Sequence, residues 1–414
     1  MASDEDLVSL GPWPLGVDNR KSDHAVPRGT LRAAENIILT SDGHARRRDG
    51  LTERLAGACH SAWSNGSTFL LVRAENLETL TRNPSGTITA TTLRSGMNMD
   101  GVNFPLVCAS IDGIIYWSNG DLTGKIVNGV NRSWGVELPA LQPTCTALTT
   151  GGLHAGRYQV TLTFIDDLGE ESGARAGVLV NVVEGGGILV AGISQPADAN
   201  VDFIRVYVTE ADSETFYLWT TLAVGTTTYT VTASSNPGRK LSTQFLVPPP
   251  PATLLCVHDG RIYGVDGKNP WFTESLRYGA MKYSNRLAFE ATPTMLASVD
   301  GGLFVAADKT YFLAGGDPTT FSPREVFPYG ALKGSAIQHP DRPGVLWLSE
   351  EGFCYGSPDG SAINLTQTKI ALRDGLESGA LVYKEENGVK QIIGAMAGGD
   401  AVSPLESTEY TEVN

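Results

Sequence analysis

Short apolar stretches alternate with turn residues along most of the chain. The segment 104–120 has apolar runs on both sides of Asp112-Gly113, and the segment 253–274 repeats this arrangement around Asp259-Gly260. Asp-Gly and Asn-Gly readily adopt the positive φ angles that two-residue hairpins require. The pattern therefore predicts an all-β protein, in which Tyr116 and Tyr263 occupy equivalent strand positions.

The same unit, a turn residue and glycine before a branched or aromatic strand, recurs along the chain. It begins near residues 41, 111, 258, 299, 351 and 386. We expect hairpins at 36–55, 253–274 and 379–396, and three strands in each of the segments 61–83, 295–315 and 345–366. One short helix is expected to open the segment 27–39 at Pro27.

The segment 142–251 has a rhythm of its own. Apolar and polar positions alternate through Tyr158–Phe164 and again through Phe203–Tyr207, and about seven short strands fit into roughly 100 residues. The stretch VPPPPA at 247–252 is typical of a stiff polyproline spacer. We therefore predict a fibronectin-III/immunoglobulin-like β-sandwich inserted at 142–251.

The flanking ranges 36–141 and 252–396 contain about 250 residues, which is about six units of 40–45 residues. They are predicted to form one split β-propeller of about six blades, with a second and third sandwich as the alternative. Residues 1–35 are expected to form an N-terminal arm, and residues 397–414 a flexible acidic C-terminal tail.

Composition narrows the class of protein. The 414 residues are 41% hydrophobic and only 18% charged, with 47 glycines, 22 prolines and a formal net charge of −14. A chain of this length is too long for a single hydrophobic core. Its high glycine and proline content favours strands joined by tight turns. Its acidity argues against an ordinary duplex-binding surface, although nucleic acid could pass such a surface without binding. With no signal peptide or membrane-length apolar run, we expect a soluble protein made in the cytoplasm.

Candidate chemistry is sparse. There is no GxxxxGK[ST], GxSxG or HExxH motif, and the Gly-Gly-Gly at 185–187 precedes no expected helix. SPDGSAI at 357–363 matches only the start of an Asp box. Glu170-Glu171 and Glu350-Glu351 are neighbours whose side chains should point apart, so neither pair suits glycosidase chemistry.

Histidines and cysteines are scattered without metal-ligand spacing. The histidines are His24, His44, His60, His154, His258 and His339. The cysteines, expected to be small core residues in a reduced compartment, are Cys59, Cys108, Cys145, Cys256 and Cys354. We therefore predict a protein that is not an enzyme, with no catalytic, cofactor-binding or metal-binding residues.

Three features leave alternatives open. The basic stretch ARRRDG at 45–50 is either a solvated hairpin or a docking strand for an acidic neighbour or phosphates. The arm around Trp13 either lies over a neighbouring subunit or caps the chain's own first blade. Five tryptophans could form the core or stack on sugars; they are Trp63, Trp117, Trp134, Trp271 and Trp347.

Several motifs together resemble a known family. GPWPLGVDNR followed by AAENIILTSDGHARRRDGLT, the later YWSNGDLTG, the predicted insert and DGRIYG…WFTES resemble the tail nozzle (tail hub) proteins of short-tailed bacteriophages. The resemblance implies a β-propeller that assembles into a ring, usually a hexamer, below the tail adaptor. Such a ring forms part of the DNA-ejection channel of the virion.

The implied partners are other copies of the chain, the tail adaptor and genomic DNA that passes without sequence-specific binding. The chain is short for a nozzle, so a position in the neck or a decorating role is also open. A carbohydrate-binding or carbohydrate-degrading β-propeller used in host recognition is the alternative function.

Overall fold

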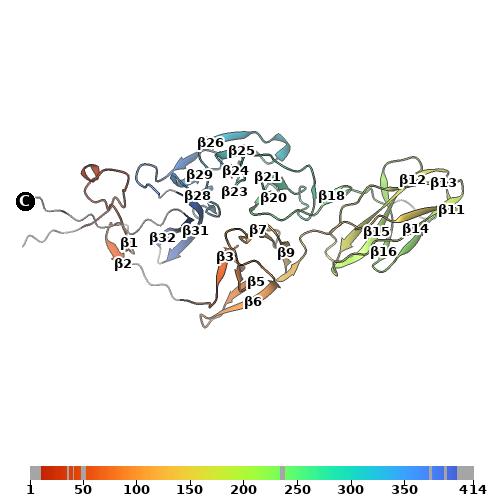
Figure 1. The fold of residues 1–414 in the computed structure, drawn as a ribbon, viewed down its shortest axis with the longest axis horizontal. Coiled ribbons are helices and arrows are strands. Elements are labelled where there is room, and N and C mark those ends of the chain that lie inside the picture. Colours follow the sequence, from red (N-terminus) through yellow and green to blue (C-terminus); the bar gives the residue numbers. More distant parts are fainter. Residues whose placement is uncertain are drawn as a thin grey trace, which may run out of the picture. The chain divides into compact units, whose positions relative to one another are not determined.

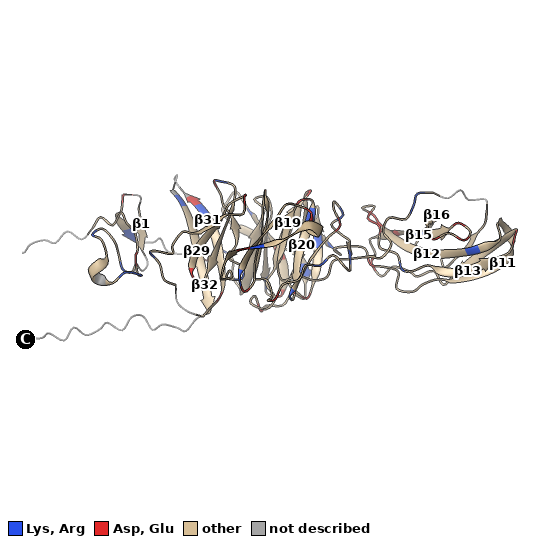
Figure 2. Ribbon diagram, turned by 90° about the horizontal axis from the view of Figure 1, so that it is seen from above, with Lys and Arg blue, Asp and Glu red and all other residues tan. Residues whose placement is uncertain are grey.

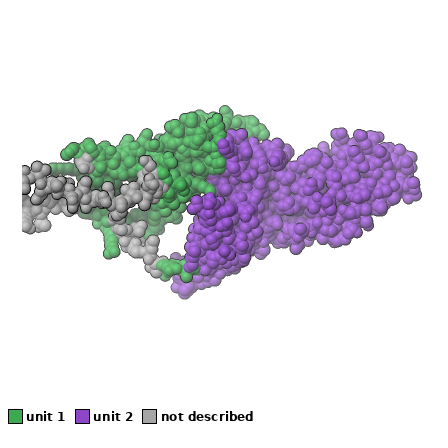
Figure 3. Space-filling model, in the orientation of Figure 1, with its two compact units in different colours: residues 1–56, 290–414 green, residues 57–289 purple. Residues whose placement is uncertain are grey.

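The computed structural model describes residues 11–34, 37–40, 42–47, 53–233, 238–372, 375–386 and 389–398. It divides into unit 1, residues 1–56 and 290–414, and unit 2, residues 57–289 (Figure 3). Charged residues of both signs occur in both units (Figure 2). Predictions for residues 1–10, Arg48–Gly50, the turn Asn387-Gly388 and residues 399–414 concern positions outside the described residues.

The all-β prediction is confirmed. The described residues form antiparallel sheets, and their helical segments are two short 3₁₀ turns, η1 (Asp23–Ala25) and η2 (Pro318–Thr320). The strands carry the labels of Figure 1.

Unit 2 contains three sheets outside the segment 142–251. The first comprises β3 (Cys59–Ser64), β4 (Phe69–Arg73), β5 (Asn76–Arg82) and β6 (Ile88–Ser95). The second comprises β7 (Val107–Ile111), β8 (Ile114–Ser118), β9 (Thr123–Val127) and β10 (Val130–Arg132). The third comprises β19 (Leu255–His258), β20 (Arg261–Asp266) and β21 (Asn269–Phe272).

Successive sheets of unit 2 share apolar cores. Leu70 and Leu77 of the first sheet cluster with Ile115 and Trp117 of the second. Tyr116, on the opposite face of β8, clusters with residues of the third sheet. The β7–β10 sheet therefore packs against the β3–β6 sheet on one face and against the β19–β21 sheet on the other.

Glycines beside tryptophans allow this close packing. A Cβ atom on Gly264 would lie 2.2 Å from the Trp271 ring, which belongs to the neighbouring strand. A Cβ atom on Gly124 would lie 2.8 Å from the ring of its cross-strand partner Trp117. In both sheets a tryptophan therefore fills space that only glycine leaves open.

The remaining strands of unit 2 form two sheets over residues 144–231, here called the two-sheet region. One sheet comprises β11 (Thr144–Leu153), β14 (Gly186–Ala191) and β17 (Thr228–Val231). The other comprises β12 (Gly156–Asp166), β13 (Val178–Val182), β15 (Val201–Thr209) and β16 (Phe216–Ala223).

One core joins both sheets of the two-sheet region. The alternating residues Tyr158, Val160, Leu162 and Phe164 all contribute to it, as the sequence pattern predicts. Ile188 and Val190 contribute from the other sheet. Full burial of a side chain such as valine or leucine stabilises a fold by about 1.5–3 kcal/mol. After this region the chain pairs β18 (Leu246–Val247) with β22 (Met281–Lys282).

Unit 1 contains two four-stranded sheets and two hairpins. The first four-stranded sheet comprises β23 (Met295–Val299), β24 (Gly302–Ala306), β25 (Thr310–Ala314) and β26 (Pro323–Phe327). The second comprises β27 (Ile337–Gln338), β28 (Val345–Ser349), β29 (Gly352–Gly356) and β30 (Ala362–Asn364). The hairpins are β1 (Ile37–Leu39) with β2 (Ala45–Arg47), and β31 (Leu376–Glu386) with β32 (Val389–Gly398). Phe304 and Trp347 lie in one core that joins the two larger sheets.

The repeated Asp-Gly segments at 112–113 and 259–260 are hairpin turns, as predicted. Asp112 and Gly113 have φ angles of 52° and 78°, and Asp259 and Gly260 have φ angles of 44° and 68°. Two positive φ angles in a two-residue loop are the signature of a type I′ turn. Tyr116 and Tyr263 lie four residues after these aspartates, and both are buried.

Three local expectations are wrong. No helix opens at Pro27, because the Leu31 N–H donates to Gly16 and the Asp18 N–H donates to Leu31, so these backbone groups bridge two arm segments instead. The segment 253–274 forms three strands rather than one hairpin, since the loop after Asp266 makes a second turn. β32 extends to Gly398, beyond the predicted boundary at residue 396.

Candidate functional site

Four of the five candidate tryptophans are core residues. Trp117, Trp134, Trp271 and Trp347 are at most 2% exposed. Trp63 is partly buried and packs against the cluster that contains Trp117. A buried ring cannot stack on a sugar, so these four residues offer no carbohydrate platform.

The neighbouring carboxylates Glu170 and Glu171 point to different partners, as predicted. Glu170 Oε2 accepts a hydrogen bond from Lys125 Nζ at 2.8 Å. Glu171 Oε2 accepts from Arg205 at 3.0 Å and from Arg239 at 2.6 Å, while its Oε1 accepts from Tyr207 at 2.7 Å. Burial raises the pKa of Tyr207, and its hydrogen bond to Glu171 adds to the shift. Both carboxylates are held in structural contacts.

Ion pairs of a buried lysine attach the two-sheet region to the β7–β10 sheet. Lys125 on β9 is 2% exposed, and its Nζ lies 2.8 Å from Glu170 and 3.7 Å from Asp166 Oδ2. Asp166 Oδ1 accepts hydrogen bonds from the backbone N–H groups of Leu168 and Glu170, which shapes the turn after β12. We call this group, Lys125 with Asp166 and Glu170, the junction cluster.

Other contacts reinforce the same junction. A Cβ atom on Gly173 would lie 1.7 Å from the Leu246 carbonyl oxygen, so the two backbones are in direct contact there. Arg132 at the end of β10 donates to Asp167, and this hydrogen bond raises the pKa of Arg132. The pKa of Asp198 is lowered: partial burial opposes the shift, but hydrogen bonds from Asn200 and Ser133 outweigh it.

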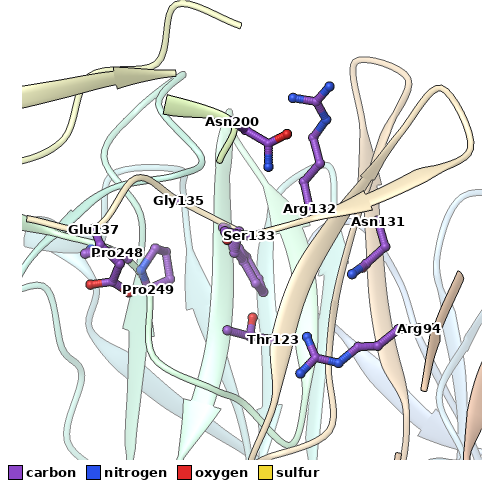
Figure 4. Close-up of a pocket in the computed structure, with 11 residues that line it drawn as sticks. Arg94, Thr123, Asn131, Arg132, Ser133, Gly135, Glu137, Asn200, Pro248 and Pro249 are labelled. Atoms are coloured by element: carbon purple, nitrogen blue, oxygen red, sulfur yellow. The ribbon is translucent and has the colours of Figure 1, made fainter. Parts of the chain in front are cut away.

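A pocket of about 370 Å³ lies beside this junction, within unit 2 (Figure 4). Its wall is formed by strands β6, β9 and β10, by the two-sheet region and by the polyproline stretch. The lining residues that matter below are Arg94, Asn131, Arg132, Glu137 and Asn200. Polar and charged groups thus converge on a space large enough for a small ligand.

Arg94 is the prominent cation of the pocket. Its guanidinium carbon lies 5.6 Å from the centre of the Trp117 ring, which fixes the side chain by a cation–π contact. Its Nε atom is buried and has no hydrogen-bond partner within the described part of the chain. Trp117 Nε1 donates to Asn131 Oδ1 at 2.8 Å. Since an indole N–H can only donate, the Asn131 amide nitrogen remains as a donor for the pocket.

In unit 1 the N-terminal arm binds residues near the C-terminal part of its own chain. Asn19 Nδ2 donates to the Ala371 carbonyl at 3.0 Å, and the Ala371 N–H donates back to Asn19 Oδ1 at 2.7 Å. Arg20 Nε donates to the Ile370 carbonyl at 2.9 Å. We call this contact the arm latch.

Asp18 shapes the arm next to the latch. It is 2% exposed and forms an ion pair with Lys21 at 2.9 Å. The hydrogen bond from Lys21 lowers the pKa of Asp18 below its ordinary value of 3.8, although desolvation opposes the shift. The residues Asp18, Asn19 and Arg20 of the sequence motif GVDNR therefore all make structural contacts within unit 1.

The remaining candidates form no reactive group in the described residues. These residues contain no cluster of three or more His, Cys, Asp or Glu side chains that could hold a metal ion. Glu350 and Glu351 form a hairpin turn, and Glu351 lies 3.6 Å from Arg20. Ala45–Arg47 of the basic stretch forms the exposed strand β2.

The cysteine prediction needs one correction. Cys354 is buried, and Cys108, Cys145 and Cys256 are partly buried, but Cys59 on β3 is exposed. Burial raises the pKa of Cys145 and Cys354 to about 11 and that of Cys256 to about 12. A thiol that remains protonated is a poor nucleophile, so these three are inert packing residues.

Sequence reasoning missed Lys125 and Arg94. Lys125 offers one signal, because a lysine inside the otherwise apolar strand Thr123–Val127 needs a partner if that strand is buried. Arg94 offers none, since it lies near the end of an edge strand rich in threonine, where a charged side chain is ordinary. Its importance depends on Trp117, which belongs to a different sheet.

No family model matches the chain, and no curated protein matches its sequence. A solved streptogramin B lyase structure has 12% identity and a TM-score of 0.34, over 82% of this chain and 94% of that one. The WD40 β-propeller domain of Doa1 has 9% identity and a TM-score of 0.30, over 83% and 90%. Structures this distant do not indicate the activity of this chain.

In the described residues, no helix has the length and apolar character needed to cross a membrane.

Proposed function

We propose that this protein is a non-enzymatic structural component of a bacteriophage tail. In this proposal it is a nozzle or hub subunit that forms a ring, six copies being the expected number, around part of the DNA-ejection channel. Its partners are other copies of itself, neighbouring tail or neck proteins such as the adaptor, and genomic DNA in transit. Its location is the virion tail, after synthesis in the bacterial cytoplasm.

The arm latch is the observation that carries the proposal. The motif GVDNR is part of the resemblance to tail nozzle proteins, and its polar residues have specific structural partners in unit 1. Asn19 and Arg20 bind the backbone of residues 370 and 371, while Asp18 accepts hydrogen bonds from the Arg20 and Lys21 amides and so shapes the turn that contains them. The motif is thus a structural signature rather than a catalytic one.

The architecture supports a split β-propeller with an insert. Five sheets of three or four strands and the β31–β32 hairpin lie outside the two-sheet region, and six blades would use each once. The two-sheet region has seven strands around one core, as expected of an inserted fibronectin-III/immunoglobulin-like β-sandwich.

Charge supports the channel role. A net charge of −14 disfavours attachment of DNA phosphates, which suits a surface past which a genome must move. The alternative, a carbohydrate-binding or carbohydrate-degrading propeller, loses most of its support because four of its five tryptophans are buried.

Virion composition tests this proposal. Mass spectrometry of purified virions from cells that carry the gene should detect the chain, and gold-labelled antibodies against it should mark the tail. A host cytoplasmic protein carried through the same purification serves as the negative control. Virions that lack the chain, or labelling confined to the capsid, would contradict the proposed role.

A further inference from the structure

The pocket beside the junction cluster has opposite charges at its two sides. Figure 4 shows Arg94 and Asn131 on one side, and Glu137 with Pro248 and Pro249 on the other. Neither Arg94 nor Glu137 forms an ion pair within the described residues. Arg132 differs, because its charge is matched by Asp167. The pocket therefore has one cation, Arg94, and one anion, Glu137, that no ion pair neutralises within the described residues. The cavity separates them.

The Arg94 side suits a carboxylate. A guanidinium group presents a planar fork of N–H donors that matches the two oxygens of a carboxylate. Contact with the Trp117 ring holds this fork in place before any ligand arrives. The free amide nitrogen of Asn131 adds a neutral donor next to it, because the Asn131 oxygen is already engaged by Trp117.

The Glu137 side suits a cationic group. Glu137 lines the pocket beside Pro248 and Pro249, which have no backbone N–H to offer to its carboxylate. Glu137 is exposed to water, and an ammonium group of a ligand would form an ion pair with it. A second anionic group at this side would instead be repelled.

We propose that this pocket binds a small amino carboxylic acid as a zwitterion. The carboxylate binds Arg94 and the Asn131 amide, and the ammonium group binds Glu137. The cavity of about 370 Å³ accommodates such a molecule. This inference does not depend on the role in a phage tail, and binding requires no bond to form or break.

Saturation-transfer NMR on the full chain tests this inference. The probes are glycine, 4-aminobutyrate and 6-aminohexanoate, each paired with the alkanoate of the same length: acetate, butyrate and hexanoate. At least one amino acid should bind more tightly than its matched alkanoate, and the best length reports the span from Arg94 to Glu137. No transfer to any probe, or equal binding of amino acid and alkanoate at every length, would overturn it.

Variants assign the two ends of the ligand. Arg94→Gln should weaken binding of the best probe about tenfold or more, since hydrogen bonds to charged groups are among the stronger ones. Arg94→Lys keeps the charge but loses the fork, so it should bind with intermediate affinity, and it tests the site should the glutamine variant fold poorly. Glu137→Gln should reduce the amino acid to the affinity of its alkanoate.

Arg261→Gln is the matched control. Arg261 is also an arginine of unit 2 held over an aromatic ring, with its guanidinium carbon 5.7 Å from the centre of Phe272, but it does not line the pocket. This variant should bind the probe like the original protein. Unchanged affinity in Arg94→Gln, or an equal loss in Arg261→Gln, would contradict the assignment.

Discussion

The junction cluster of unit 2 and the arm latch of unit 1 each hold together two segments that are distant in the sequence. They do so through different interactions. The junction cluster buries a charged lysine against two carboxylates. The arm latch uses exposed side chains that bind backbone groups, with water available as a substitute. The contact of the buried lysine is therefore costly to break, while the exposed contact sets the path of the arm and contributes little to stability.

Removing the buried cation should give the largest effect. Lys125→Met leaves the buried Asp166 and the partly exposed Glu170 without their counter-charge. Breaking a fully buried pair typically destabilises by about 3–5 kcal/mol, and because water can reach Glu170 the loss is expected at the lower end of that range. Chemical denaturation, followed by fluorescence, measures this loss in the full chain. Lys268→Met, which changes an exposed lysine of the same unit, is the control and should be close to neutral.

The double variant Lys125→Met/Glu170→Leu sharpens this result. Removing the partner carboxylate as well should recover part of the lost stability, because the main uncompensated charge is gone. A double variant as unstable as the sum of both single variants would mean that the charges do not interact.

Asn19→Ala tests the stronger half of the arm latch. The substitution removes two hydrogen bonds to Ala371 and should cost about 1 kcal/mol, since the partners become accessible to water. Hydrogen exchange should accelerate at Ala371 while the two-sheet region is unchanged. A loss as large as that of Lys125→Met would remove the distinction between the two attachments.

Acid should loosen the arm through Asp18. Because the folded pKa of Asp18 lies below 3.8, its contribution is present above that pH and is lost as the pH falls through the lower, folded value. At neutral pH, Asp18→Asn should therefore exchange faster than the original protein at the Leu31 amide. This difference should disappear in acid; a difference that persists at all pH values would show that the Asp18 charge is not responsible.

The smallest effect is expected for Arg20→Ala. Its contact with Glu351 is exposed at 3.6 Å, so the variant should lose less than about 1 kcal/mol, mostly through the hydrogen bond to Ile370. Added salt should change the stability of the original protein and of the variant almost equally. A strongly salt-dependent difference would assign the arm latch to the ion pair instead.

Local chemistry made much of the fold predictable. Asp112-Gly113 and Asp259-Gly260 adopt the expected turns because their φ preferences act within two residues. The alternation from Tyr158 to Phe164 likewise matches one buried face. Pro27 failed as a helix start because Leu31 pairs with Gly16 and Asp18, contacts that no local propensity contains.

The sites were less predictable for the same reason. Lys125 meets Glu170 across 45 positions, and Asn19 meets Ala371 across 352. Pairings of this range are chosen by the packing of whole sheets. Sequence reasoning correctly separated Glu170 from Glu171, adjacent residues of the turn after β12, but it could not name their partners.

Cryo-electron microscopy of intact virions tests the proposed role most directly. Density is expected for several copies of this chain arranged as a closed ring around the axial channel of the tail, with six copies as the expected number. The proposed role would be contradicted by a tail reconstruction in which this chain is absent or in which its copies do not surround the channel.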